Sequence, residues 1–471
     1  ASNNTAVGHL SLTANTTGAD NTSIGSASLA ANTTGTLNTA SGSNALRYNT
    51  TGDNNTALGR LALHNNTTAN NNTAVGKSAL FANTTGAQNV GIGTNALDAN
   101  TTASYNSATG HHSLKLNTTG SENAGFGSFS LQSNTTGGSN TAVGYQALDA
   151  NTTASNNTAV GRDAMQANTT GAANVAVGYQ ALDANTTAAG NNAVGSQALS
   201  ANTTGASNNA MGQQALFGNT TGSNNTAIGH VALGDNTTAS NNTAVGYFAL
   251  NANTTGPHNT ALGTEAGSAL TTGAENVFLG YKAGNHDVAQ ATGSGNICIG
   301  PYTDTSTTAG NFATVIGYNV TGAAGYTTLG ETANDIRAAH GVADWNEVSD
   351  ERLKKDIVDS TAGLSFINAL QPRTFKYKTL GELPETFIAY EADSTEVFKS
   401  SQTQHGFIAQ EIKAAIDADD SIKDGFRFWG ERDDGCQEVA PTTLIPVLVK
   451  AIQELSEQNA ALTARIAALE E

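Results

Sequence analysis

The feature that most constrains the fold is a 17-residue repeat. The motif Asn-Thr-Ala-Val-Gly begins at Asn4 and recurs every 17 residues, in 17 copies, through Asn276-Val-Phe-Leu-Gly. The full repeat is Asn-Thr-Ala-Val-Gly-x-x-Ala-Leu-x-Ala-Asn-Thr-Thr-Gly-x-x, and we number its positions 1 to 17 from the first Asn. A short fixed period is typical of a solenoid, in which each repeat buries a core only by stacking on its neighbours.

Most positions of the repeat have a physical interpretation. Position 5 is Gly in every copy, as at Gly8 and Gly263, which indicates a turn that needs a positive φ angle or close backbone approach. Position 4 is usually apolar, as at Val7, and position 9 is almost always Leu; we expect both to point inward, giving two apolar contacts per coil. The Asn-Thr-Thr steps are formal glycosylation sequons, but we interpret them as turns whose Asn side chains stack into hydrogen-bonded ladders.

These constraints predict a mainly β fold. Seventeen residues are too few for a helix pair, and Gly and β-branched residues disfavour helices. We therefore predict a parallel β-solenoid, or β-roll, shaft over residues 1–284, followed by a degenerate β-rich neck over 285–345. Two apolar residues per coil make a thin core, so we expect a homotrimer. The repeat is similar to the left-handed β-roll repeats of trimeric autotransporter adhesin heads, a resemblance that covers roughly residues 1–290.

Charge and hydropathy narrow the classes of partner. The chain has 20 Lys and Arg against 38 Asp and Glu, a net charge of −18 that disfavours nucleic acid as a partner. A mean hydropathy of −0.27 predicts no membrane span. Charged residues become frequent near Trp345, which indicates a second kind of structure from there on. The chain begins with Ala1 and not with Met, so we expect a piece of a longer or processed protein.

Three motifs after this boundary occur in a fixed order. They are Trp345-Asn-Glu-Val-Ser-Asp-Glu-Arg-Leu-Lys-Lys-Asp-Ile, Leu370-Gln-Pro-Arg-Thr-Phe-Lys-Tyr and His405-Gly-Phe-Ile-Ala-Gln-Glu-Ile. We expect a short helix from Glu351, a strand over 374–378 and a short helix over 411–418. The set resembles the intramolecular chaperone auto-processing domain, or chaperone of endosialidase, found at the ends of phage tail spikes and fibres. The resemblance implies a small α+β domain over 346–440 that trimerises the fibre and then cuts itself off.

The same resemblance implies the chemistry of the cut. It places the cut between Val348 and Ser349, with the Ser349 hydroxyl attacking the preceding carbonyl and Lys354 acting as the general base. A lysine accepts a proton only when neutral, which burial favours, and Ser349 must lie in a loop because five residues along a helix do not share a face. Asp350 and His405 match supporting positions. The alternative is a helix cap followed by a solvated lysine, with His405 structural.

Residues 441–471 have the pattern of a coiled-coil helix. The heptad a and d positions alternate along the segment as Ile445, Leu448, Ile452, Leu455, Asn459, Leu462, Ile466 and Leu469. Ile at a, Leu at d and an Asn at a usually favour two strands. The attached domain implies three, and we expect Val449 and Ala451 to widen the apolar seam accordingly.

Other motifs support weaker interpretations. Tyr145, Tyr179 and Tyr247 each follow the turn glycine and form either a sugar-binding aromatic stripe or ordinary surface aromatics. The His111-His112 pair lacks further ligands, and we expect neither a metal nor another cofactor.

We therefore predict a tail fibre or similar host-attachment appendage, in a virion or on a cell surface, with a glycan or protein receptor. Its one enzymatic activity would be single-turnover autoproteolysis. The alternatives are a trimeric autotransporter-like surface adhesin and an ice-binding solenoid. In the second case the adjacent Thr16 and Thr17, if they lay in a strand, would point to opposite faces. A glycan-degrading tail spike would need paired carboxylates, and the acids of the repeats are isolated.

Overall fold

The computed structural model describes residues 1–286, 291–332, 334–341, 346–347, 351, 354–385, 387, 390–420, 422–423, 426–431 and 435–470. The chain divides into two compact units, residues 1–348 and residues 349–471. We call them the shaft and the carboxy-terminal domain and describe each by itself.

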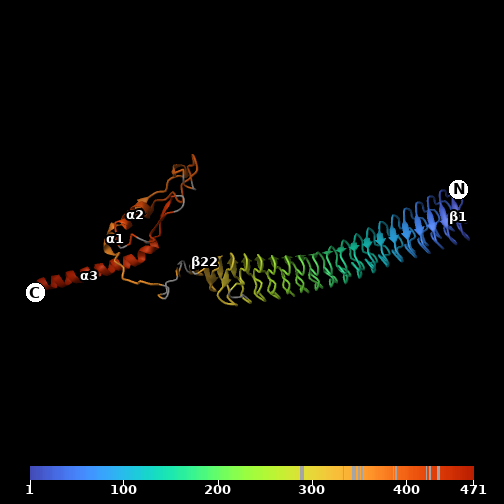
Figure 1. Ribbon diagram of the computed structural model, residues 1–471. Coiled ribbons are helices and arrows are strands. Elements are labelled where there is room, and N and C mark those ends of the chain that lie inside the picture. The colour runs from blue at the N-terminus through green and yellow to red at the C-terminus, as the bar shows by residue number, and fades with distance from the viewer. Residues whose placement is uncertain are drawn as a thin grey trace. The chain divides into compact units, whose positions relative to one another are not determined.

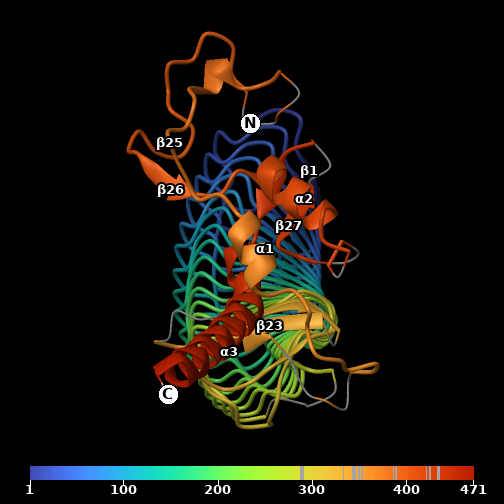
Figure 2. The same ribbon diagram turned by 90° about the vertical axis from the view of Figure 1, so that its left-hand side faces the viewer.

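The shaft is a parallel β-solenoid, which confirms the predicted fold class (Figure 1). Each of its first 17 coils contributes one three-residue strand, and consecutive strands pair in parallel with a register of 17 residues, as in Thr158↔Val175. Figure 2 shows the successive coils lying one behind another. The strands are β1 (Thr5–Val7), β2 (Thr22–Ile24), β3 (Thr39–Ser41), β4 (Thr56–Leu58), β5 (Thr73–Val75), β6 (Val90–Ile92), β7 (Ser107–Thr109), β8 (Ala124–Phe126), β9 (Thr141–Val143), β10 (Thr158–Val160), β11 (Val175–Val177), β12 (Asn192–Val194), β13 (Asn209–Met211), β14 (Thr226–Ile228), β15 (Thr243–Val245), β16 (Thr260–Leu262) and β17 (Val277–Leu279).

The parallel sheet continues beyond residue 284, where the sequence pattern becomes irregular. Strands β18 (Ile297–Ile299), β20 (Thr314–Tyr318) and β22 (Tyr326–Glu331) extend it in parallel. Beside them, β19 (Asp304–Thr305) pairs with β21 (Thr321–Gly322). The parallel run ends at β23 (Asn334–Ala339), which is antiparallel to β22 and pairs with β24 (Asn346–Glu347).

The core of the shaft differs from the predicted one at one position. Leu at position 9 points inward as expected, and Leu148 is fully buried. Position 4 points outward, so this part of the prediction is wrong: Val7 is 58% exposed and Ile24 44%. The reason is strand alternation, because Ala at position 3, such as Ala142, is fully buried and therefore turns positions 2 and 4 to the outer face of the sheet. The core consists of the small residues at positions 3 and 8 and Leu at position 9.

Two buried asparagine ladders run along the shaft, of which the one at position 12 was predicted. At position 12, Asn168 Nδ2 donates to Asn151 Oδ1 (3.1 Å) and to the Gly171 carbonyl (3.0 Å), while Asn168 Oδ1 accepts from Asn185 Nδ2 (2.8 Å). At position 1, the backbone N–H of Asn157 donates to the side-chain oxygen of the Asn one coil earlier (3.0 Å). Because the asparagines of the Asn-Thr-Thr steps are fully buried from Asn32 onward and hydrogen-bonded, they are structural side chains in the folded shaft.

The threonine pair after each ladder Asn lies in a turn and not in a strand. The position-13 hydroxyl bonds the next coil, as Thr169 Oγ1 donates to the Thr186 carbonyl (3.0 Å). The position-14 residue, such as Thr170, is exposed. Side chains alternate between two faces only in a strand, so this rule, which would point Thr16 and Thr17 to opposite faces, does not apply to the pair.

Each coil depends on its neighbours for its backbone conformation. Gly144 has φ +141°, and a Cβ there would clash with the Gly161 carbonyl. Gln146 and Leu148, which carry side chains, also have positive φ angles, 56° and 53°. Such residues disfavour this region by about 1–2 kcal/mol each, and they are held by bonds to adjacent coils, as from Leu148 N–H to the Ala164 carbonyl (3.0 Å). A coil without a neighbour would therefore lose the contacts that maintain its shape.

The irregular repeat at the end of the regular array has a compensated core. Position 9 is Gly at Gly267 and Gly284, and a Cβ at either would clash with the ring of Phe278, which replaces the usual small residue at position 3. Phe278 is fully buried and fills the space that two leucines would occupy. In the same region Leu270 replaces the ladder Asn, so the position-12 ladder ends at Asn253.

We predict that Asn168→Ala destabilises the shaft by about 2 kcal/mol. The substitution removes two donated hydrogen bonds and leaves one N–H of the Asn185 amide without its acceptor in a buried site, while that amide keeps its bond to the Ala188 carbonyl. Thermal unfolding followed by circular dichroism measures the effect. Thr170→Ala, on the exposed side of the same turn, is the matched control and should leave the unfolding temperature unchanged.

The carboxy-terminal domain is a small α+β unit with a long final helix. Its helices α1 and α2 and the first turns of α3 bury a compact core that includes Phe366, Ile412, Phe428 and Val447. Its elements are α1 (Leu364–Ala369), β25 (Arg373–Phe375), the 3₁₀ helix η2 (Leu380–Glu382), β26 (Gln404–Gly406), α2 (Ala409–Asp417), β27 (Trp429–Glu431), β28 (Gln437–Val439), the 3₁₀ helix η3 (Pro441–Leu444) and α3 (Ile445–Glu470). Among the described residues, no helix has the length and apolar character that crossing a bilayer requires.

Candidate functional site

The residues of the predicted cut lie mostly outside the described part of the chain. Val348, Ser349 and Asp350 are outside it, as are residues 352–353 of the expected helix. Lys354 is described: its side chain is exposed in a single chain, and its backbone N–H donates to the Glu351 carbonyl (3.0 Å). The burial expected around this lysine is thus not provided by the described residues of one chain.

His405 lies on β26, directly opposite Thr374 of β25. Its ring Nδ1 is 3.3 Å from Thr374 Oγ1, and its side chain is exposed. This cross-strand contact joins the second and third sequence motifs of the domain. In one chain His405 therefore has a structural contact, and its predicted supporting role at the cut stays a prediction.

An ion pair that the sequence analysis did not identify connects the same motifs. Arg373 on β25 makes a two-pronged contact with Glu411 on α2, with Nη2···Oε1 at 2.7 Å and Nε···Oε2 at 3.0 Å. Hydrogen bonding from Arg373 holds the pKa of Glu411 below its usual value. The contact therefore stabilises the domain at neutral pH and is lost when acidification passes below the ordinary glutamate range, about pH 4. Glu411 is thus a structural residue of the motif.

Helix α3 has two different faces. Leu444, just before it, and Val447 and Ala451 within it are buried in the domain core. Glu454 continues this face, and its carboxylate accepts the backbone N–H of Leu364 (2.8 Å) at the start of α1. Ala451 therefore packs inside its own domain, and the prediction that it widens the coiled-coil seam is wrong, whereas Val449 is 50% exposed.

The opposite face of α3 carries the predicted heptad positions, and none of them is covered in a single chain. Ile452 is 66% exposed and Leu455 47%, although both are large and apolar. The other exposed positions of this seam are Ile445, Leu448, Asn459, Leu462, Ile466 and Leu469. Such a row of exposed apolar side chains is typical of a helix that packs against other helices.

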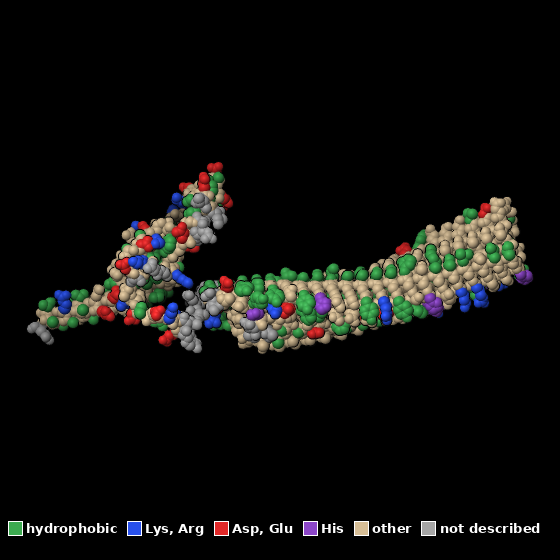
Figure 3. All heavy atoms as spheres, viewed as in Figure 1, with side chains coloured by type: hydrophobic (Ala, Val, Ile, Leu, Met, Phe, Trp, Pro, Cys, Tyr) green, Lys and Arg blue, Asp and Glu red, His purple; other side chains and the backbone are tan. Residues whose placement is uncertain are grey.

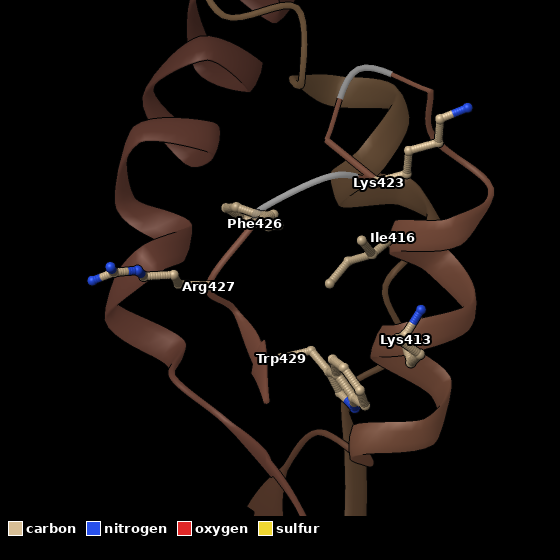
Figure 4. Close-up of a pocket in the computed structure, with 6 residues that line it drawn as sticks. All are labelled: Lys413, Ile416, Lys423, Phe426, Arg427 and Trp429. Carbon is tan, nitrogen blue, oxygen red and sulfur yellow. The ribbon is translucent and has the colours of Figure 1, made fainter. Parts of the chain in front are cut away.

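A cleft of about 400 Å³ lies between α2 and the segment that leads into β27 (Figure 4). Ile416 and Trp429 point into it, and Lys413 Nζ lies 5.1 Å from the centre of a Trp429 ring. Its remaining lining residues are Lys423, Phe426 and Arg427. Among the lining residues that the structure describes, none is a serine, cysteine or histidine that could act as a nucleophile in peptide-bond cleavage.

The outer face of the shaft sheet carries a second uncovered apolar row. Position 4 is exposed or half-buried along the shaft and is apolar in every copy but two, which have Ser41 and Thr109. Positions 2 and 4 hold no charged residue in any of the 17 copies. Figure 3 shows rows of hydrophobic side chains following the shaft. The most exposed members of position 4 are Val7, Ile24, Leu58, Ile92, Phe126, Val143, Val177, Val194, Met211, Ile228 and Leu262.

Comparison with known families identifies one region of the chain. Residues 349–420 match the family model described as chaperone of endosialidase. A search of curated proteins gave no match. The chain is thus a solenoid fibre followed by a domain of the endosialidase-chaperone type, and the matched region begins where the second compact unit begins.

Proposed function

We propose that the protein is a homotrimeric host-attachment fibre, such as a phage tail fibre, located in a virion or outside the cell. Its carboxy-terminal domain would assemble three shafts and then cut itself off between Val348 and Ser349. The observation that carries the proposal is that each unit leaves one long apolar row uncovered in a single chain: position 4 on the shaft and the heptad seam on α3.

The shaft row suits contact between protein chains. Its members differ in size and shape, from Val143 through Met211 to Phe126. An ice-binding face would need a regular flat array of hydroxyls. Position 2 of the same face is Thr in ten of the 17 copies, but the unequal side chains at position 4 beside it leave the face uneven. Close packing of irregular side chains against a second and third copy would remove them from water. Complete burial of one such side chain contributes about 1.5–3 kcal/mol, and burial of the part still exposed here contributes roughly half of that.

The fold also explains why such a shaft needs an assembly domain. Each coil holds side-chain-bearing residues at positive φ and buried asparagines whose hydrogen bonding is completed only by neighbouring coils. The first coil to form must therefore adopt these positive φ angles and leave its asparagine ladder bonds unmade, because no neighbouring coil is present to stabilise it. A trimer formed early by α3 and its domain would hold three chain ends together and give the shaft a starting point.

The position of the family match, which begins at residue 349, supports a self-cleavage step. The Ser349 hydroxyl would transfer its proton to neutral Lys354, its oxygen would bond to the Val348 carbonyl carbon, and the C–N bond would break as the nitrogen takes a proton. Water would then hydrolyse the ester, leaving a Val348 carboxylate and a Ser349 hydroxyl. The cut falls between the two compact units and divides neither. Because Lys354 is exposed in one chain, its desolvation would come from the assembled trimer, so that cutting follows assembly.

We predict that the double variant Val177→Asp and Val194→Asp destroys the association of the shafts. Both side chains are about one-third exposed at position 4, at 36% and 37%, and charges there would be buried between copies. Sedimentation velocity should show a shift from trimer to smaller or aggregated species. Thr170→Asp, exposed at position 14, is the control and should sediment as the wild type does. Unchanged assembly of the double variant would exclude this face as the interface.

A further inference from the structure

We propose that the side of the shaft around Tyr145, Arg162 and Tyr179 is a binding surface for an uncharged, linear glycan. The inference deepens the proposed attachment role by naming a ligand class and a surface. It rests on that role only for the origin of the glycan on a cell, and it is independent of self-cleavage.

Positions 6, 7 and 10 of the repeat differ chemically from the rest of the shaft. All six Lys and Arg residues of the first 331 lie at these positions: Arg47, Arg60, Lys77, Lys115, Arg162 and Lys282. Most shaft histidines and tyrosines lie there too, and several are in ring contact, as His230 stacks on Tyr247 with centroids 5.5 Å apart. Figure 3 shows charged and histidine side chains gathered along the shaft beside the apolar rows. The fold fixes the residue type at positions 5 and 9 but not here.

We call positions 6, 7 and 10 along the shaft the strip. Within it, two tyrosines two coils apart offer exposed aromatic rings on which a sugar could stack. Tyr145 and Tyr179 both occupy position 6, two coils apart, and are 47% and 43% exposed. The spacing of parallel strands places equivalent residues two coils apart at about 10 Å. Such a spacing matches alternate rings of an extended oligosaccharide, whose C–H faces stack on exposed aromatic rings.

Hydrogen-bonding groups lie between and beside these two rings. Arg162, in the intervening coil, is 5.7 Å from the centre of the Tyr179 ring, and its Nε donates to the buried carboxylate of Asp163 (3.1 Å). Asp149 and Asp183 occupy position 10 in the same coils as the two tyrosines and are half-buried. Asp149 Oδ1 is buried and accepts no hydrogen bond from any residue that the structure describes. Asp149 Oδ1 itself is out of reach of a ligand on the surface, but the exposed parts of these half-buried carboxylates can accept hydrogen bonds from sugar hydroxyls.

The charge of the surface selects an uncharged ligand. Its three aspartates outnumber its single arginine, and the arginine is already paired with Asp163. Burial raises the pKa values of Asp149 and Asp183. Backbone N–H groups partly offset this for Asp183, whereas nothing offsets it for Asp149 among the residues that the structure describes. Sialylated or other anionic glycans would add to this uncompensated negative charge. A neutral glycan supplies hydroxyl donors without a repulsive charge.

The test uses the full chain and a panel of neutral linear hexasaccharides: cellohexaose, maltohexaose, laminarihexaose, mannohexaose and chitohexaose in its N-acetylated form. A sialylated oligosaccharide serves as the anionic comparison. Binding is measured by isothermal titration calorimetry. We expect at least one neutral member to bind and the sialylated one not to bind. The double variant Tyr145→Ala and Tyr179→Ala should weaken the binding about tenfold or more, since two ring contacts are lost.

Tyr105→Ala is the matched control. Tyr105 is 60% exposed but occupies position 17, outside the strip, so its removal should leave binding unchanged. Failure of every neutral hexasaccharide to bind, or binding that the double variant leaves intact, overturns the inference. Sedimentation of the same samples keeps the two proposals separate, because a trimer that binds no glycan contradicts only this one.

Discussion

Ser349→Ala is expected to leave the polypeptide in one piece of 47.7 kDa, whereas the wild type should yield fragments 1–348 and 349–471. Removing the hydroxyl removes the only atom that this mechanism uses to attack the Val348 carbonyl. Loss of a nucleophile in a serine-type site lowers the rate by at least about a thousandfold. Intact-mass spectrometry of freshly expressed protein measures the outcome.

Lys354→Ala should have the same effect, because a serine hydroxyl is a weak nucleophile without a base to accept its proton. The neighbouring Lys355 offers a matched control, since it has the same charge and lies one residue further along the chain. Lys355→Ala should be cut as the wild type is. Cleavage of Ser349→Ala at the wild-type rate would contradict the dyad. A wild-type chain that stays intact would leave the domain as an assembly module alone.

The second large effect concerns the seam of α3. The double variant Ile452→Asp and Leu455→Asp is expected to abolish trimerisation and, with it, folding of the shaft. Both side chains are uncovered in one chain, so the substitutions disturb no contact within the domain core, but in a coiled coil they would bury several carboxylates together. Each buried, unpaired charge opposes assembly by several kcal/mol.

Size-exclusion chromatography with light scattering measures the mass, and circular dichroism measures the β content of the shaft. Gln453→Asp with Ala460→Asp is the control, because both residues are exposed at heptad position b, away from the seam. This pair should assemble normally. A seam variant that still forms trimers with a folded shaft would show that α3 does not direct assembly.

Much of the shaft could be predicted because its repeat is under local constraints. A glycine at every position 5 indicated the turn, and the recurring Asn at position 12 indicated the ladder in which Asn168 lies. The direction of position 4 could not be predicted from its apolar character. A three-residue strand has room for one inward side chain, and in this narrow coil that side chain is the small Ala142, not the larger Val143.

The carboxy-terminal domain was predictable in its motifs and less so in its contacts. The heptad pattern of α3 identified the exposed face, but it could not show that Ala451 belongs to the opposite, buried face, because alanine fits both environments. The pairing of Arg373 with Glu411 joins residues 38 positions apart, and no spacing rule predicts such a contact. The only indication of this pair in the sequence was that both residues lie in motifs that carry the family resemblance.

The central claim is that three chains assemble into one fibre and that residues 349–471 bring them together. Sedimentation equilibrium of the full chain, beside a chain ending at Val348 that was never attached to the domain, tests it most directly. The account predicts three copies per particle for material made with the domain, and unfolded or aggregated material for the chain made without it. A monodisperse, folded single chain in both samples would contradict it.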